Sequence, residues 1–237
     1  MSDMEVYVRE NRAAKASSAL SGVLDELLEN ALPDEFVGSA LGRGCKVLML
    51  AVSGRVQLDD EIICAEKLIR VASRLEPDAS KPQPYLSSAR RAFSKVYKQC
   101  GRHQDAVSML DLAIEAAAPA RDILSIRARA EAYLGLAGSE AKQSTAQAAA
   151  IDAAVADART VYAMVAKEDE MFVADQMQLA RLINIALDMK QVDKASSAEV
   201  KEAYDLTQAV IAASPKNNVH HELAQYLQGD LLPFLPP

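Results

Sequence analysis

A spacing of small and aliphatic residues that ends in proline recurs along the chain and limits what it can fold into. It reads A-x3-I-x2-A-x4-P over 65–77 and A-x3-L-x2-A-x5-P over 106–119, and a shorter version, L-x2-A-x5-P, spans 206–215. Positions i, i+4 and i+7 share one face of a helix. Small residues on that face let a neighbouring backbone approach, the aliphatic residue fills the groove, and proline ends the helix. The spacing predicts repeated pairs of packed helices.

The helix before the second copy carries a matching pattern. The matching residues are Phe93, Ser94, Tyr97 and Gly101, and a later segment keeps the small-x2-Tyr spacing as Ala130 and Tyr133. On these residues the chain resembles the tetratricopeptide repeat (TPR) family, whose pattern is L-G-x2-Y, then A-x3-F, then P. It departs from the family at the tryptophan position, which holds Arg90, and in the first copy, which has Val52, Ser53 and Val56.

The rest of the chain also reads as helix, without a convincing alternating strand. Helical stretches are expected near 5–32, 36–53, 59–75, 85–100, 104–117, 121–136, 146–167, 171–190, 198–213 and 218–228. Pro33 should end the first, and Asp34 should cap the next. An insertion at 137–150 either extends a helix or forms a loop. The alternative to a repeat array is an irregular helical bundle, because alanine-rich amphipathic helices can mimic this spacing.

The resemblance implies an all-α fold, a right-handed superhelix of antiparallel helix pairs in one continuous domain. We expect an N-terminal helical cap over 1–45, the TPR-like array over 46–216, and a C-terminal capping helix with an apolar, proline-rich tail over 217–237. The tail, DLLPFLPP, either seals the last helix or docks in a partner's groove.

Composition narrows the function classes. The 237-residue chain is half hydrophobic, has no tryptophan and carries a net charge of −7. An acidic balance argues against general nucleic-acid binding, which needs a basic footprint. The three cysteines form no C-x-x-C pair, which favours free thiols in a reducing compartment. The early acids argue against a signal or transit peptide, and the longest apolar run, at 47–52, is too short to span a bilayer. We therefore expect a soluble, cytoplasmic protein.

Cys100, His103 and Asp105 are residue types that a thiol enzyme or a metal site uses. Their positions favour a turn instead: Cys100 precedes Gly101 at a helix end, and Asp105 suits the start of the next helix. Thiol catalysis also needs an oxyanion hole, and a zinc site needs three or four ligands. The adjacent histidines at 220 and 221 should face solvent. We expect no enzyme activity, no cofactor and no metal.

A basic stretch is the most informative charge feature. Residues 79–104 hold six basic residues and no acid, and Arg91, Lys95, Lys98 and Arg102 follow one another at helical spacing. In the TPR register, Arg91, Lys95 and Lys98 would line the concave groove formed by first helices, and Arg127 and Arg181 would join from later ones. The chaperone carboxylate clamp of some family members is not expected, because the position of its asparagine holds Lys95.

Two interpretations of the basic row remain open. It forms a groove for an acidic peptide or a partner's carboxylate, or it is a solvated face balanced by acids on neighbouring helices. The first makes the chain a non-enzymatic interaction module, either an adaptor, a scaffold or a co-chaperone-like protein. The alternative function is a structural subunit of a larger assembly, homo- or hetero-oligomeric, that uses the N-terminal helix and the C-terminal tail as contacts.

Overall fold

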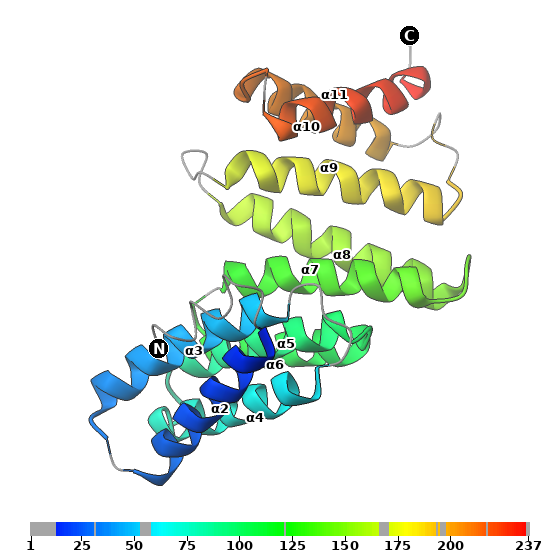
Figure 1. Cartoon of the computed structure of the whole chain (residues 1–237). Coiled ribbons are helices and arrows are strands. Elements are labelled where there is room, and N and C mark those ends of the chain that lie inside the picture. Colours follow the sequence, from blue (N-terminus) through cyan, green and yellow to red (C-terminus); the bar gives the residue numbers. More distant parts are fainter. Residues whose placement is uncertain are drawn as a thin grey trace. The chain divides into compact units, whose positions relative to one another are not determined.

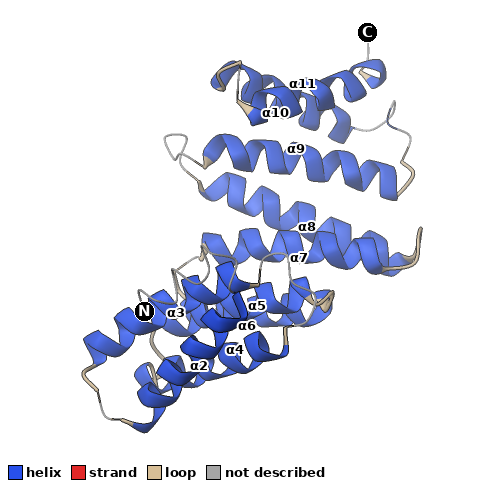
Figure 2. Ribbon diagram, in the orientation of Figure 1, coloured by secondary structure: helices blue, strands red, loops and turns tan. Residues whose placement is uncertain are grey.

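The structure is a computed structural model and describes residues 13–30, 32–52, 58–120, 122–165, 171–192, 194, 198–216 and 218–235. Their helices are α-helices and short 3-10 segments, and no strand occurs among these residues (Figure 2). Ser53 and Val56 of the first repeat copy, like residues 1–12 of the expected N-terminal cap, lie outside the described residues. The expected all-helical fold is confirmed.

The helices follow the expected order, with boundaries within a few residues of those expected, except the start of the first at residue 5, which lies outside the described residues. Their bounds are α2 Ala13–Glu29, α3 Asp34–Ala51, α4 Asp59–Leu75, α5 Pro84–Gln99, α6 His103–Ala117, α7 Ile123–Ser139, α8 Thr145–Met164, α9 Phe172–Met189, α10 Ala198–Ala213, α11 Val219–Leu231 and η2 Leu232–Phe234 (Figure 1). The chain divides into two compact units, residues 1–132 and 133–237, and the division falls inside α7. The expected boundaries at 45 and 216 stay predictions.

In the first unit, α3 packs against α4 and α5 against α6, while α3 also packs against α5. The small residues of the repeat explain the close packing of α5 and α6. Ala106 and Ala113 are completely buried on α6, and Leu110 fills the space between them. A fully buried aliphatic side chain such as Leu110 contributes roughly 1.5 to 3 kcal/mol. The repeat spacing therefore acts as predicted.

In the second unit, α8, α9, α10 and α11 each pack against the next helix along the chain. Their buried faces form one apolar core that also takes in Tyr133, Leu134 and Ala137 from the end of α7. The insertion at 137–150 both extends a helix and forms a loop. Helix α7 continues to Ser139, a short loop follows, and α8 begins after Ser144, whose side chain accepts a hydrogen bond from the Gln147 amide at 3.0 Å.

Two local expectations were wrong. Asp34 is the first residue of α3 and not its cap, since the preceding position is Pro33 and no side chain caps the helix. His221 is buried, and its Nδ1 lies 3.1 Å from the carbonyl oxygen of Ser214. His221 lies on the face of α11 that packs into the core, a position that the adjacent-histidine pattern did not reveal.

Candidate functional site

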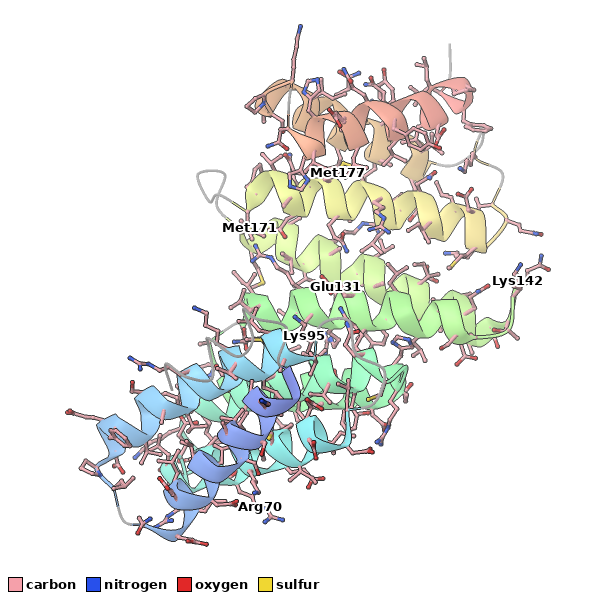
Figure 3. The ribbon with its side chains drawn as sticks, viewed as in Figure 1. Arg70, Lys95, Glu131, Lys142, Met171 and Met177 are labelled. Atoms are coloured by element: carbon pink, nitrogen blue, oxygen red, sulfur yellow. The ribbon has the colours of Figure 1, made fainter. Side chains whose placement is uncertain are left out.

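Three of the expected basic residues line one pocket of about 260 Å3 in the first unit. Arg91, Lys95 and Lys98 project from α5, and Figure 3 labels Lys95 and, on α7, Glu131. Its remaining lining comes from four helices: Met49 of α3, Ser94 and Gln99 of α5, Leu110 of α6, and Ala128, Glu131 and Ala132 of α7. We call it the basic pocket. Most of its wall comes from α3, α5 and α7.

Arg91 is already bound within the fold. One of its guanidinium nitrogens (Nη1) donates to Asp122 Oδ2 at 2.9 Å and to Asp122 Oδ1 at 3.2 Å, and both side chains are largely buried. Asp122 also accepts hydrogen bonds from the hydroxyls of Ser87 and Ser125, each at 2.6 Å. Arg91 thus helps to fasten the start of α7 to α5.

The environment of Asp122 favours its charged form. Burial alone would raise the pKa of this carboxyl. The hydrogen bonds from Ser125 and Ser87 and the charge of Arg91 together outweigh burial, so the pKa of Asp122 lies below its ordinary value. Asp122 therefore stays ionised and balances the charge of Arg91 at neutral pH.

Lys98 also has an acidic partner, because its ammonium forms an ion pair with Glu131 across the pocket. Lys95 differs from both. Among the described residues it has neither a hydrogen-bond nor an ion-pair partner. Burial, followed by the charge of Lys98, lowers the pKa of Lys95, and Glu131 opposes this shift. The basic pocket therefore carries one half-buried positive charge that no acid of the described structure neutralises directly.

The other three expected residues lie outside the pocket. Helix α5 ends at Gln99, so Arg102 does not continue its basic row. Instead, Arg102 lies 4.4 Å from the centre of the Tyr97 ring and pairs with Asp105 at 2.6 Å. Arg127 is half-buried on α7, and Arg181 is exposed on α9 in the second unit. None of these three lines the basic pocket. The expected single row was wrong at Arg102, because a glycine turn intervenes.

The sequence did not identify which acids pair with the basic row. Asp122 and Glu131 lie more than thirty residues from their partners in sequence. A capping signal does mark Asp122, whose side chain accepts from the amide of Ser125 three residues later. That local signal contains no information about Arg91. Two cations of the row are therefore balanced by acids on neighbouring helices, whereas Lys95 has no acidic partner among the described residues. Binding of an acidic peptide stays a prediction.

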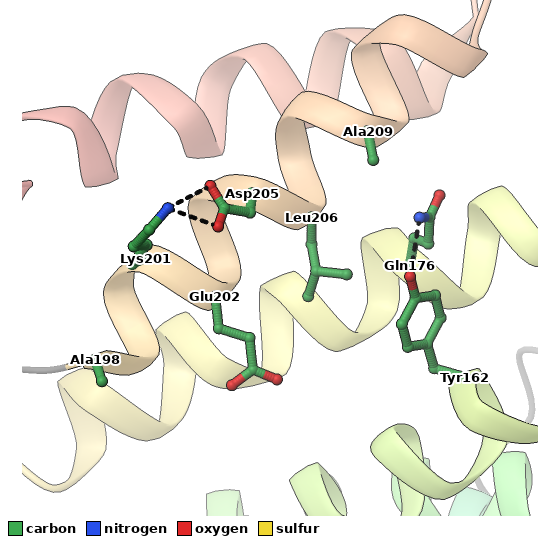
Figure 4. A pocket seen from close by; sticks show the side chains of 8 residues that line it. All are labelled: Tyr162, Gln176, Ala198, Lys201, Glu202, Asp205, Leu206 and Ala209. Atoms are coloured by element: carbon green, nitrogen blue, oxygen red, sulfur yellow. Dashed lines mark hydrogen bonds and ion pairs between the residues drawn. The ribbon is translucent and has the colours of Figure 1, made fainter.

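The second unit contains a larger pocket, of about 480 Å3, between α8, α9 and α10 (Figure 4). Its polar groups largely satisfy one another. Gln176 donates to the Tyr162 hydroxyl at 3.3 Å, Lys201 pairs with Asp205 at 2.8 Å, and Glu202 pairs with Arg159 at 2.6 Å. This pocket is the weaker candidate, since its charges are already paired.

Cys100, His103 and Asp105 do not assemble into a catalytic group. Burial raises the pKa of Cys100, whereas a nucleophilic thiol needs a lowered pKa. Burial, followed by the charge of Lys98, lowers the pKa of His103, and Asp105 is engaged by Arg102. Across the described ranges, no group of three potential ligands could hold a metal ion.

Comparison with known proteins establishes the fold. No protein family has a sequence profile that matches the chain, and no curated protein matches it. Two solved structures do, both of a Podosopora anserina kinesin light chain-like protein with nearly identical TPR-like repeats, one of them a single-substitution variant. The variant has a TM-score of 0.59 at 18% identity, covering 89% of this chain and 91% of its own. The other has a TM-score of 0.56 at 17% identity, covering 89% and 94%. The chain has a TPR-like helical-repeat fold.

TPR-like repeats generally mediate contacts between proteins. In the described part of this TPR-like chain, no helix is long and apolar enough to cross a membrane. The fold and the basic pocket are therefore the features on which a functional proposal can rest.

Proposed function

We propose that this TPR-like chain is a non-enzymatic interaction module, an adaptor or scaffold, that binds an acidic segment of a partner protein in the basic pocket. The observation that carries the proposal is the half-buried ammonium of Lys95, which lies in a pocket between helices and has no acidic partner among the described residues. A ligand carboxylate would supply the missing counter-charge in a partly desolvated site, where charge-assisted hydrogen bonds are strong.

Arg91 and Lys98 have supporting roles in this proposal. Arg91 is paired with Asp122 and Lys98 with Glu131, so each positive charge is largely balanced within the fold. Each side chain can still donate a hydrogen bond to a ligand from a fixed position. Lys95 would make the principal contact, while Met49 and Leu110 offer apolar surface for neighbouring ligand side chains. The proposal includes a cytoplasmic location, which the three free cysteines favour.

The experiment is a binding titration with fluorescent peptides of matched length that carry glutamates, lysines or neutral residues. We expect wild-type protein to prefer the acidic peptides, and we expect added salt to weaken that binding. Lys95→Ala should raise the Kd at least about tenfold, which corresponds to about 1.4 kcal/mol. Lys95 is the right target because Arg91→Ala would also remove the Asp122 ion pair and disturb the fold.

Lys142→Ala is the matched control, because Lys142 is exposed on a loop of the second unit (Figure 3). It should bind acidic peptides as the wild type does. Equal affinity for acidic and neutral peptides, or unchanged affinity in Lys95→Ala, would overturn the proposal.

The alternative function, a structural subunit that makes contacts through the ends of the chain, is favoured by one observation. Leu232 and Phe234 of the tail remain exposed, and so do apolar side chains of α11. This alternative is compatible with a binding role for the basic pocket, because the two use different surfaces.

A further inference from the structure

Helix α11 carries an apolar stripe on its exposed side. Val219, Leu223 and Tyr226 follow one another at spacings of four and three residues and are 60%, 49% and 74% exposed. The core contacts of α11 come from its other side, where His221, Ala224, Leu227 and Leu231 are buried. The stripe therefore adds nothing to the packing of the chain itself, although an exposed apolar surface in water is unfavourable.

The described residues of the C-terminal tail, up to Leu235, leave this stripe exposed. Leu235 is half-buried against the core of the second unit, and the Phe234 ring lies 5.5 Å from Lys194 Nζ. Leu232 remains exposed. The described tail residues thus pack against the second unit or face solvent, and the stripe stays exposed.

The charges of α11 indicate what covers the stripe. Asp230 lies in the last turn, where the helix dipole is negative, and that turn holds no basic residue. Asp230 has no ion-pair partner within the described ranges. Glu222, by contrast, lies favourably in the first turn. An antiparallel helix laid along the stripe would bring a positive N-terminal end beside Asp230.

We propose that a second copy of this chain packs its α11 antiparallel against the first, around a two-fold axis between residues 224 and 225. Helical spacing then sets Leu223 against the partner's Tyr226 and places Asp230 beside the partner's Val219, at the N-terminal end of the partner helix. Gly229 borders the stripe with open space around it, so the partner backbone can approach closely there. A two-fold contact of this kind uses each surface once and closes at two copies.

The size of the surface limits the strength of the dimer. Two α11 helices with their adjoining tails would bury on the order of 1,000 Å2 in total, the lower end for specific association. The dimer should therefore form in the micromolar range, and the free monomer should be fully folded.

The test is sedimentation equilibrium of the full chain from about 1 µM to about 300 µM, a range suited to an interface of this size. We expect a reversible monomer–dimer equilibrium in the wild type. Tyr226→Lys and Asp230→Lys should each raise the dissociation constant at least about tenfold. Asp230→Lys should also leave the thermal midpoint of the monomer unchanged or higher, because a base suits the end of its own helix. That result separates loss of the interface from loss of the fold.

Ile63→Lys is the matched control, since Ile63 is a half-exposed aliphatic residue on α4. It should dimerise as the wild type does.

The relative orientation of the two α11 helices is determined from mixed disulfides in a Cys100→Ser background. Val219→Cys protein mixed with Asp230→Cys protein should cross-link between the two variants, whereas a parallel pair would cross-link each variant to itself. A monomer at every concentration, growth beyond two copies, parallel cross-links, or a dimer that neither lysine variant weakens would overturn the proposal.

Discussion

At the scale of single residues, Asp122 is the most connected charged group beside the basic pocket. It accepts hydrogen bonds from Ser87, Arg91 and Ser125, and it caps the start of α7. Asp122→Ala removes the cap and leaves the largely buried guanidinium of Arg91 without its acid. We expect a loss of about 3 kcal/mol in the free energy of unfolding, measured by urea denaturation.

Asp105→Ala is the control for that substitution. Asp105 also lies in the first turn of a helix and pairs with an arginine, but its pair with Arg102 is exposed to solvent. Its removal should lower stability much less than removal of Asp122. Equal losses in the two variants would contradict the structural role assigned to the Arg91–Asp122 pair.

The carboxyl of Asp122 makes the stability of the fold depend on pH in the acidic range. Because the pKa of Asp122 is lower in the folded chain than its ordinary value of 3.8, its ionised form stabilises the fold at neutral pH. That contribution begins to decline as the pH falls to about 3.8 and is lost below the folded-state pKa. The stability gap between wild type and Asp122→Asn should therefore narrow from pH 7 to pH 3. A gap that stays constant would show that ionisation of Asp122 contributes nothing.

The cysteines should behave as structural residues. Burial raises the pKa of Cys45 to about 12 and that of Cys64 to about 11, and it raises the pKa of Cys100 as well. At pH 7.5 the native protein should therefore react with a thiol reagent more slowly than free cysteine does, and urea should release full reactivity. Rapid labelling of Cys100 in the native protein would reopen the thiol-enzyme hypothesis.

At the scale of elements, the turn between α5 and α6 depends on one glycine. Gly101 has a φ of +72°, which side chains with a Cβ rarely adopt, and no neighbouring atom would obstruct a Cβ. Gly101→Ala should therefore cost about 1 kcal/mol through the backbone alone. Gly42, inside α3 and equally open, provides the opposite control. Gly42→Ala should raise stability by up to about 1 kcal/mol in the same urea titration, and two changes of the same sign would contradict this account.

The helices were predictable from sequence because their signals are local. The spacing of Ala106, Leu110 and Ala113 lies within two turns of one helix, and Gly101 and Pro119 mark the two ends of that helix. The end of α5 was the exception that mattered for the site, since the basic spacing continues to Arg102 across the glycine turn. Sequence periodicity cannot show that the helix carrying a charge has already ended.

The site itself was only partly predictable. Helical spacing placed Arg91, Lys95 and Lys98 on one face of one helix, and the three side chains line one pocket. Their differences arise from Asp122 and Glu131, which only tertiary packing brings near. The lone charge of Lys95 is therefore a property of the assembled helices and not of the basic row alone.

At the scale of the whole molecule, the TPR-like fold offers two surfaces with different chemistry. The basic pocket of the first unit is small, charged and partly enclosed, which suits a short acidic segment. The α11 stripe of the second unit is apolar and exposed, which suits a helix. The two proposals concern different surfaces, so their tests are independent. Acidic peptides can bind the basic pocket even if the chain does not self-associate, and the chain can self-associate even if the peptides do not bind.

The central claim is that Lys95 binds an acidic segment of a partner. Its most direct test is to measure the pKa of Lys95 by NMR of selectively labelled lysine side chains, with and without an acidic peptide. In the free protein, the pKa of Lys95 should lie below the ordinary value for lysine, because burial and the charge of Lys98 disfavour its charged form. Saturating acidic peptide should raise the pKa of Lys95. If the pKa of Lys95 is not lowered in the free protein, or does not respond to the peptide, the basic pocket is not the binding site.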